Sequence, residues 1–95
     1  MTTQAEKQYL NRVASLGCVI CHHLGVEQSD AEIHHIRAGQ GMAQRAQHWL
    51  TVPLCPAHHR GTHGIHGDRQ SLKQFKLDEF DLLAWTIKQI FEDSV

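Results

Sequence analysis

Residues 54–66 hold the densest group of metal-binding and phosphate-binding side chains in this 95-residue sequence. This stretch contains one cysteine, four histidines and one arginine. Two upstream patterns complement it, a Cys18-x-x-Cys21 pair and the step His34-His35. Thiolates and imidazoles are the protein ligands that zinc and related ions prefer. The three segments together therefore predict a chemistry that depends on bound metal.

The cysteines predict a structural zinc site. Cys18, Cys21, Cys55 and His58 form two pairs at x-x spacing, which suits one tetrahedral Zn²⁺. Three cysteines cannot all pair as disulfides, and a chain this short has a modest core that a metal can staple. The alternative is that the cysteines are buried free thiols. Reduced thiols and the lack of a signal-like N-terminus favour a cytoplasmic location.

The remaining histidines predict a second site. His34 and His35 point to opposite sides of a strand, so one can hold metal while the other acts on substrate. His59 and His63 lie four residues apart, on one face if a helix continues that far; His48 and His66 are further candidates. The alternative is that these histidines are polar surface residues.

Charge is distributed unevenly. The net charge is −1, but residues 33–76 hold six basic residues against one acid, Asp68, and the flanks hold the other nine acids. The middle is thus locally basic, which favours a compact nucleic-acid contact over a DNA-coating protein. No apolar run approaches the length of a membrane span.

The elements that must position these residues can be read from capping and periodicity. Trp49 begins a strand predicted over 49–53 and is expected to pack in the core beside it. The alternative is that Trp49 stacks on a nucleobase. Pro53 is expected to end that strand or lie at a sheet edge. We predict a helix over 4–16, a zinc knuckle at 18–21 followed by a loop, strands over 32–36 and 49–53, a short helix from Pro56, and C-terminal helices within 71–92.

The order of these motifs resembles that of the HNH (ββα-metal) endonucleases, and more closely the phage and prophage Ref-type recombination-enhancement nucleases. The resemblance is carried by residues 17–21, 31–41, 52–60 and 65–67. It implies an α+β fold: one HNH nuclease domain over 1–95, with a small ββα-metal finger at 32–67, a structural zinc, and flanking N- and C-terminal helices.

The resemblance also implies roles. His35 matches the general base, His34 the first metal ligand and His59 the ligand on the helix; the last ligand is His63 or His66. The asparagine of the HNH pattern is absent, and His48 is the nearest candidate for its place. The ions implied are a structural Zn²⁺ and a catalytic Mg²⁺, Mn²⁺, Zn²⁺ or Ni²⁺. Arg37 and Arg60 are the predicted phosphate contacts; Arg60 is equally well explained as a solvated helix residue.

The predicted function is a metal-dependent DNA endonuclease or nickase in phage recombination or DNA processing. The resemblance implies DNA as substrate and a RecA-type recombinase filament as partner. Relatives can carry a basic N-terminal extension that this sequence lacks, so the filament partnership stays open. The alternatives are a non-catalytic zinc-stapled nucleic-acid-binding module and a metal-stapled protein-interaction domain. The first alternative would not need His35, and the second would not need the basic middle of the chain.

Overall fold

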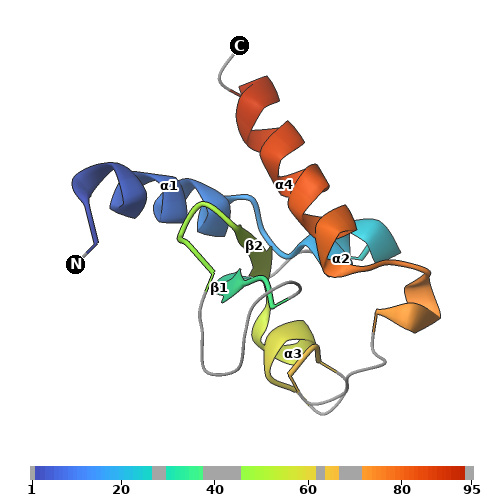
Figure 1. Ribbon diagram of the computed structural model, residues 1–95. Helices are drawn as coiled ribbons and strands as arrows, with labels where there is room; N and C mark the ends of the chain where they lie inside the picture. The colour runs from blue at the N-terminus through green and yellow to red at the C-terminus, as the bar shows by residue number, and fades with distance from the viewer. Residues whose placement is uncertain (1, 27–29, 38–45, 62–63, 67–71, 94–95) are drawn as a thin grey trace.

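The computed structural model describes residues 2–26, 30–37, 46–61, 64–66 and 72–93. Its elements follow in the order α1 (Gln4–Ser15), α2 (Val19–Leu24), β1 (Glu32–His35), β2 (Thr51–Leu54), α3 (Pro56–His59), the 3-10 turn η1 (Lys73–Phe75) and α4 (Glu79–Asp93). The two-stranded sheet lies at the centre, with α1 to one side, α3 below, and α4 running away from the sheet (Figure 1). The predicted α+β class is confirmed.

The first helix starts where its capping residues require. The Thr3 hydroxyl accepts a hydrogen bond from the Glu6 N–H (3.1 Å), and the Glu6 carboxylate accepts one from the Thr3 N–H (2.9 Å). The helix ends at Ser15, and Gly17 then turns the chain with a φ of 79°, a conformation that glycine adopts without strain. None of the helices among the described residues is long and apolar enough to cross a membrane.

The segment after Cys18 differs from the sequence prediction. A tight turn and loop were expected, but residues Val19–Leu24 form helix α2. Cys18 caps its N-terminus, since the Sγ atom accepts the Cys21 N–H, and Gly25 closes the helix in the left-handed conformation at φ 73°. Six residues are too few to display helical periodicity, so the caps were the only available signal.

The sheet is a single antiparallel pair with His34 opposite Val52 and His35 opposite Thr51. Strand β2 starts two residues later than predicted because residues 47–50 form a turn, closed by a hydrogen bond from the Leu50 N–H to the Gln47 carbonyl (2.9 Å). Pro53 lies inside β2 and does not end it. Each strand of a two-stranded sheet has one unpaired side, where a missing N–H costs no ladder bond.

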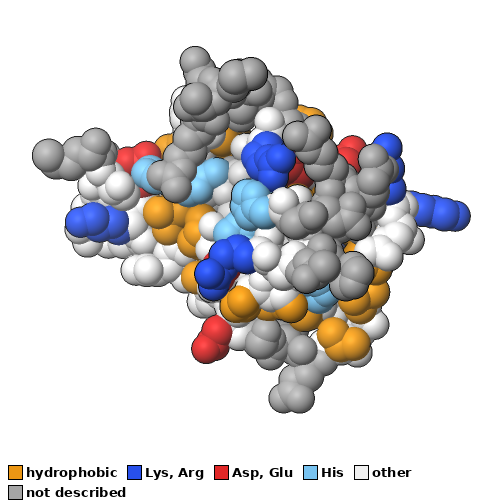
Figure 2. All heavy atoms as spheres, turned by 90° about the horizontal axis from the view of Figure 1, so that it is seen from below, with side chains coloured by type: hydrophobic (Ala, Val, Ile, Leu, Met, Phe, Trp, Pro, Cys, Tyr) orange, Lys and Arg blue, Asp and Glu red, His pale blue; other side chains and the backbone are white. Residues whose placement is uncertain are grey.

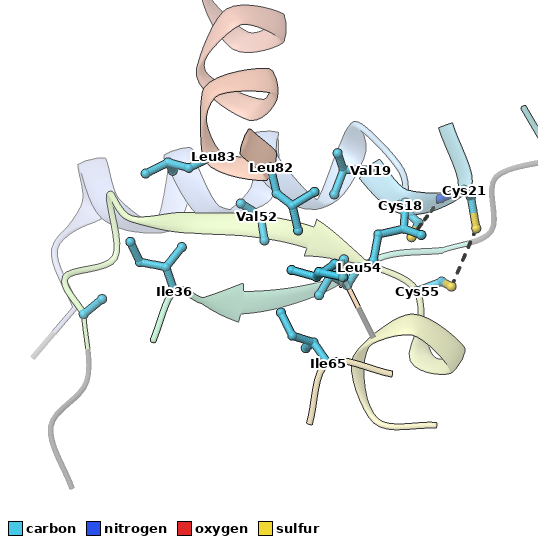
Figure 3. Close-up of a cluster of buried hydrophobic side chains, with 13 residues drawn as sticks. Cys18, Val19, Cys21, Ile36, Val52, Leu54, Cys55, Ile65, Leu82 and Leu83 are labelled. Carbon is cyan, nitrogen blue, oxygen red and sulfur yellow. Dashed lines mark hydrogen bonds between the residues drawn. The ribbon is translucent and has the colours of Figure 1, made fainter. Parts of the chain in front are cut away.

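The core forms where β2 meets the helices. Val52 and Leu54 are fully buried, and Figure 3 shows Val19, Leu82 and Leu83 on one side of them and Ile65 near α3. All three cysteines belong to the same buried cluster. The three predicted cysteine ligands are therefore part of the core, and His58 lies at its edge, half-buried.

Candidate metal centres and active site

The four predicted zinc ligands converge from two elements, α2 and α3. Cys18 and Cys21 come from the start of α2, and Cys55 and His58 from the start of α3, with all four ligand atoms within 4.8 Å of one another. His58 Nδ1 lies 3.5 Å from the sulfurs of Cys18 and Cys21 and 3.2 Å from that of Cys55. The sulfurs of Cys21 and Cys55 are 3.8 Å apart (Figure 3).

These distances fit a tetrahedral ion. Bond lengths of about 2.3 Å to sulfur and about 2.0–2.1 Å to nitrogen place two sulfurs roughly 3.8 Å apart, and a sulfur and a nitrogen roughly 3.6 Å apart. The spacing between donors therefore matches zinc geometry closely. We call this group of four residues the thiolate cluster.

The electrostatics of the thiolate cluster also favour a cation. Burial raises the pKa of the Cys21 thiol to about 12, and the neighbouring Cys18 and Cys55 add to this shift. Burial also lowers the pKa of His58, which keeps its imidazole neutral and able to bind metal. Buried thiols in this setting ionise only when a cation compensates them, as a coordinated metal does.

A second group consists of His34, His59 and His66, which we call the histidine cluster. Their ligand nitrogens also lie within 4.8 Å of one another. His59 Nε2 and His66 Nε2 are 3.0 Å apart. Metal–nitrogen bonds of about 2.0–2.1 Å place neighbouring ligand nitrogens roughly 2.9–3.4 Å apart in octahedral or tetrahedral coordination. The cluster can therefore hold a divalent ion while leaving coordination positions open.

A glycine-dependent turn brings His66 to His59. Helix α3 ends at His59, so the helical spacing that favoured His63 has no helix to support it. The returning chain satisfies the exposed carbonyls of α3: the His66 N–H donates to the His59 carbonyl (3.1 Å). A Cβ on Gly64 would lie 2.9 Å from the Ala57 carbonyl oxygen, so the turn requires glycine there. His63 itself lies outside the described residues.

Each histidine of this cluster is held by a second side chain. Glu32 Oε1 lies 2.8 Å from His59 Nδ1, and Glu79 Oε2 lies 2.7 Å from His34 Nε2. Carboxylates in this position fix the ring and increase its basicity toward a metal. His66 differs, because Nη1 of Arg37 donates to its Nδ1 at 3.0 Å.

The sequence reasoning missed both carboxylates and counted them with the acidic flanks. Glu32 had a usable signal, since it lies two residues before His34 on the same face of β1. The sequence held no local signal for Glu79, because its partner His34 is 45 residues away in the chain.

His35 lies beside the histidine cluster and contacts His48. The two rings are hydrogen-bonded between His35 Nε2 and His48 Nδ1 at 3.0 Å. The Thr2 hydroxyl lies 3.3 Å from His48 Nε2. His35 also lines a cavity of about 250 Å³, whose walls are formed by Ile33, His34, His35, Ile36, Arg37, Ala46, His59 and His66. His35 and the three clustered histidines thus share one opening.

The two predicted phosphate contacts have different surroundings. Arg60 is paired with Glu32 through two contacts. Its Nε donates to Oε1 at 2.9 Å, and its Nη2 donates to Oε2. This pairing lowers the pKa of Glu32 and raises that of Arg60. Arg37 is exposed, lines the cavity, and has its backbone N–H held by Glu79. Figure 2 shows histidines and basic side chains together on the lower face of the molecule.

A two-stranded sheet followed by a short helix, with a cysteine–histidine cluster that could hold zinc, defines a small protein of the ββα-metal finger type. Residues 2–91 match the family described as recombination enhancement, RecA-dependent nuclease, and the chain belongs to that family. No curated protein and no solved structure matches the chain. The family description indicates a nuclease that acts in recombination.

Proposed function

We propose that this protein is a metal-dependent DNA endonuclease of the HNH type, with His35 as its general base. The observation that carries the proposal is that His35 shares one cavity with the histidine cluster. A phosphodiester placed in that opening would meet a proton acceptor and a cation-binding group together. Hydrolysis requires both functions.

In this mechanism, a neutral His35 takes a proton from a water molecule as the water oxygen attacks phosphorus. The bond from phosphorus to the 3′ oxygen breaks, and the 3′ oxygen takes a proton from solvent water, which leaves a 5′-phosphate and a 3′-hydroxyl. A divalent ion held by His34, His59 and His66 would stabilise the negative charge on the phosphate and the leaving oxygen. Imidazole donors suit Zn²⁺ and Ni²⁺ best, and Mn²⁺ or Mg²⁺ would need water and phosphate oxygens to complete their coordination.

His48 supports the base in this proposal. Its Nδ1 lies 3.0 Å from His35 Nε2, a contact that would fix the orientation of the His35 ring. The thiolate cluster has a different task. It would hold α2 and α3 together through zinc, and α3 carries His59.

Arg37 would bind the phosphate once the cation is in place. A guanidinium can only donate, so its contact with His66 Nδ1 requires the lone pair there and the proton on Nε2. If His66 held an ion, its remaining proton would lie on Nδ1, and the contact with the guanidinium would be lost. Arg37 would then be able to donate to a phosphate in the cavity that it already lines.

The decisive experiment is plasmid nicking with a panel of divalent ions. We expect His35→Ala to abolish nicking while zinc content and the melting curve stay normal. The matched control is His23→Ala, which removes an exposed histidine of α2 that does not line the cavity. Unchanged nicking by His35→Ala would overturn the assignment and leave a zinc-stapled nucleic-acid-binding module as the better explanation.

We also propose DNA bound by a RecA-type filament as the physiological substrate, on the strength of the family description. Nicking should rise when a RecA-type recombinase is loaded on a single strand that matches the plasmid. Equal nicking with and without the filament would remove this part of the proposal.

A further inference from the structure

The turn at residues 47–50 places the rings of His48 and Trp49 in different surroundings. It is closed by the Leu50 N–H on the Gln47 carbonyl (2.9 Å) and by the Thr51 hydroxyl on the His48 carbonyl (3.0 Å). His48 is half-buried and its ring contacts His35. Trp49, the next residue, is 42% exposed. The expected core packing of Trp49 is therefore not what the structure shows.

The indole of Trp49 is supported from one side. Its ring centroid lies 5.0 Å from that of Tyr9 on α1, with the two planes tilted by 60°. A tilted aromatic pair of this kind is favourable and restricts the orientation of the indole. The result is a large, oriented aromatic side chain that remains partly exposed to solvent one residue from His48.

This position is close to the proposed site of cleavage. The Ile36 N–H donates to the Leu50 carbonyl at 3.0 Å, so the turn is joined to the chain just after His35. On the lower face of the molecule, hydrophobic side chains lie directly beside the histidines (Figure 2). A nucleotide next to a phosphate in the cavity would therefore reach this part of the surface.

We propose that Trp49, supported by Tyr9, is a stacking site for an unpaired nucleobase next to the scissile phosphate. The inference rests on the proposed nuclease function and adds a substrate class to it. Bases inside a duplex already stack on both faces, so an indole can stack only on a base that has left the helix. The site thus selects single-stranded or locally unpaired DNA.

The charge of the protein supports a contact of this kind. With a net charge of −1, the chain can gain only modest affinity from phosphate neutralisation. Stacking provides affinity that does not depend on net charge and accepts any base, since every base has a π face. Binding should therefore be less sensitive to salt than phosphate contacts alone would make it.

Tryptophan fluorescence tests binding without cleavage. The His35→Ala protein is titrated with an oligothymidylate single strand and, separately, with a blunt duplex. We expect the single strand to quench emission and the duplex to have little effect. The same titration of His35→Ala carrying Trp49→Phe isolates Trp85, whose emission should not change. Equal quenching by both DNAs, or quenching that survives Trp49→Phe, would overturn the proposal.

Cleavage provides a second readout on an unpaired substrate. Stacking contributes about 1–3 kcal/mol per base, so Trp49→Ala should raise KM about 5- to 150-fold and leave kcat nearly unchanged. Trp49→Phe should recover most of the affinity because it keeps an aromatic face. An unchanged KM in Trp49→Ala would refute the stacking site. If His35→Ala still cleaves while Trp49 is quenched, the nuclease mechanism fails and the stacking site stands.

Discussion

Glu32→Gln tests whether the carboxylates behind the histidine cluster serve a metal. Glu32 accepts from His59 Nδ1 at 2.8 Å and from Arg60 Nε at 2.9 Å. The amide keeps the shape of the side chain and one acceptor oxygen but loses the charge. His59 should become a weaker ligand, while the thiolate cluster, whose ligands come from α2, α3 and their N-caps, should be unaffected.

The size of the effect follows from this geometry. Loss of an outer-shell partner lowers metal affinity about 10- to 100-fold. Because glutamine preserves one acceptor, we expect Glu32→Gln at the lower end of that range and Glu32→Ala at the upper end. The assay is calorimetric titration with Ni²⁺ after zinc has filled the thiolate cluster. Ni²⁺ suits the imidazole ligands, and its binding then reports the histidine cluster.

Two controls sharpen this test. Asp30→Asn removes an exposed carboxylate two residues earlier in the chain and should leave Ni²⁺ affinity unchanged. In a His59→Ala background, Glu32→Gln should have no further effect, because the interaction it alters is already gone. Wild-type Ni²⁺ affinity in Glu32→Gln, or loss of zinc together with Ni²⁺, would refute the reasoning.

Three other predictions concern the metal ligands. Cys55→Ser should unfold the domain, because structural zinc contributes about 10–16 kcal/mol and a chain of this length has only about 5–14 kcal/mol of stability; a normal melting curve would contradict the zinc site. His66→Ala should lose the Ni²⁺ site whereas His63→Ala keeps it, as titration of each variant will show. Acidification should lower the free energy of unfolding. Burial lowers the pKa of His58 and His66 below 6.5, so the unfolded chain takes up protons at a higher pH than the folded chain does. The stability present above pH 6.5 is therefore lost as the pH falls from 6.5 through the lowered pKa of the folded state. Melting temperatures from pH 7.5 to 5.5 test this, and a rise on acidification would show the sign to be wrong.

The fold could be predicted in outline because its signals are local. The Thr3 capping box, the proline that starts α3 and the periodicity of the last helix each determine a boundary within a few neighbouring residues. Helix α2 could not be predicted from periodicity, since it is shorter than two turns. The start of β2 was misjudged because nothing in residues 47–50 signals a turn to sequence rules based on glycine and proline.

The site could be predicted only where its spacing is short. Cys18 and Cys21, and Cys55 and His58, are each three residues apart, so turn geometry alone brings each pair together. The choice between His63 and His66 depended on where α3 ends, which is set by contacts of the returning chain with α3. Glu79 reaches His34 only through tertiary packing of α4. No local rule could have assigned it.

Helix α3 connects the two candidate metal centres directly. His58 points to the thiolate cluster and His59, its neighbour, to the histidine cluster, so a single peptide bond joins them. Their Cα atoms are about 3.8 Å apart across one planar peptide, so fixing His58 in α3 also restrains the backbone that carries His59. Loading of the first centre with zinc would therefore orient His59 before a second ion arrives, and the order of assembly would be built into the chain. A cell short of zinc would then hold an unassembled enzyme, one that added magnesium or manganese cannot rescue.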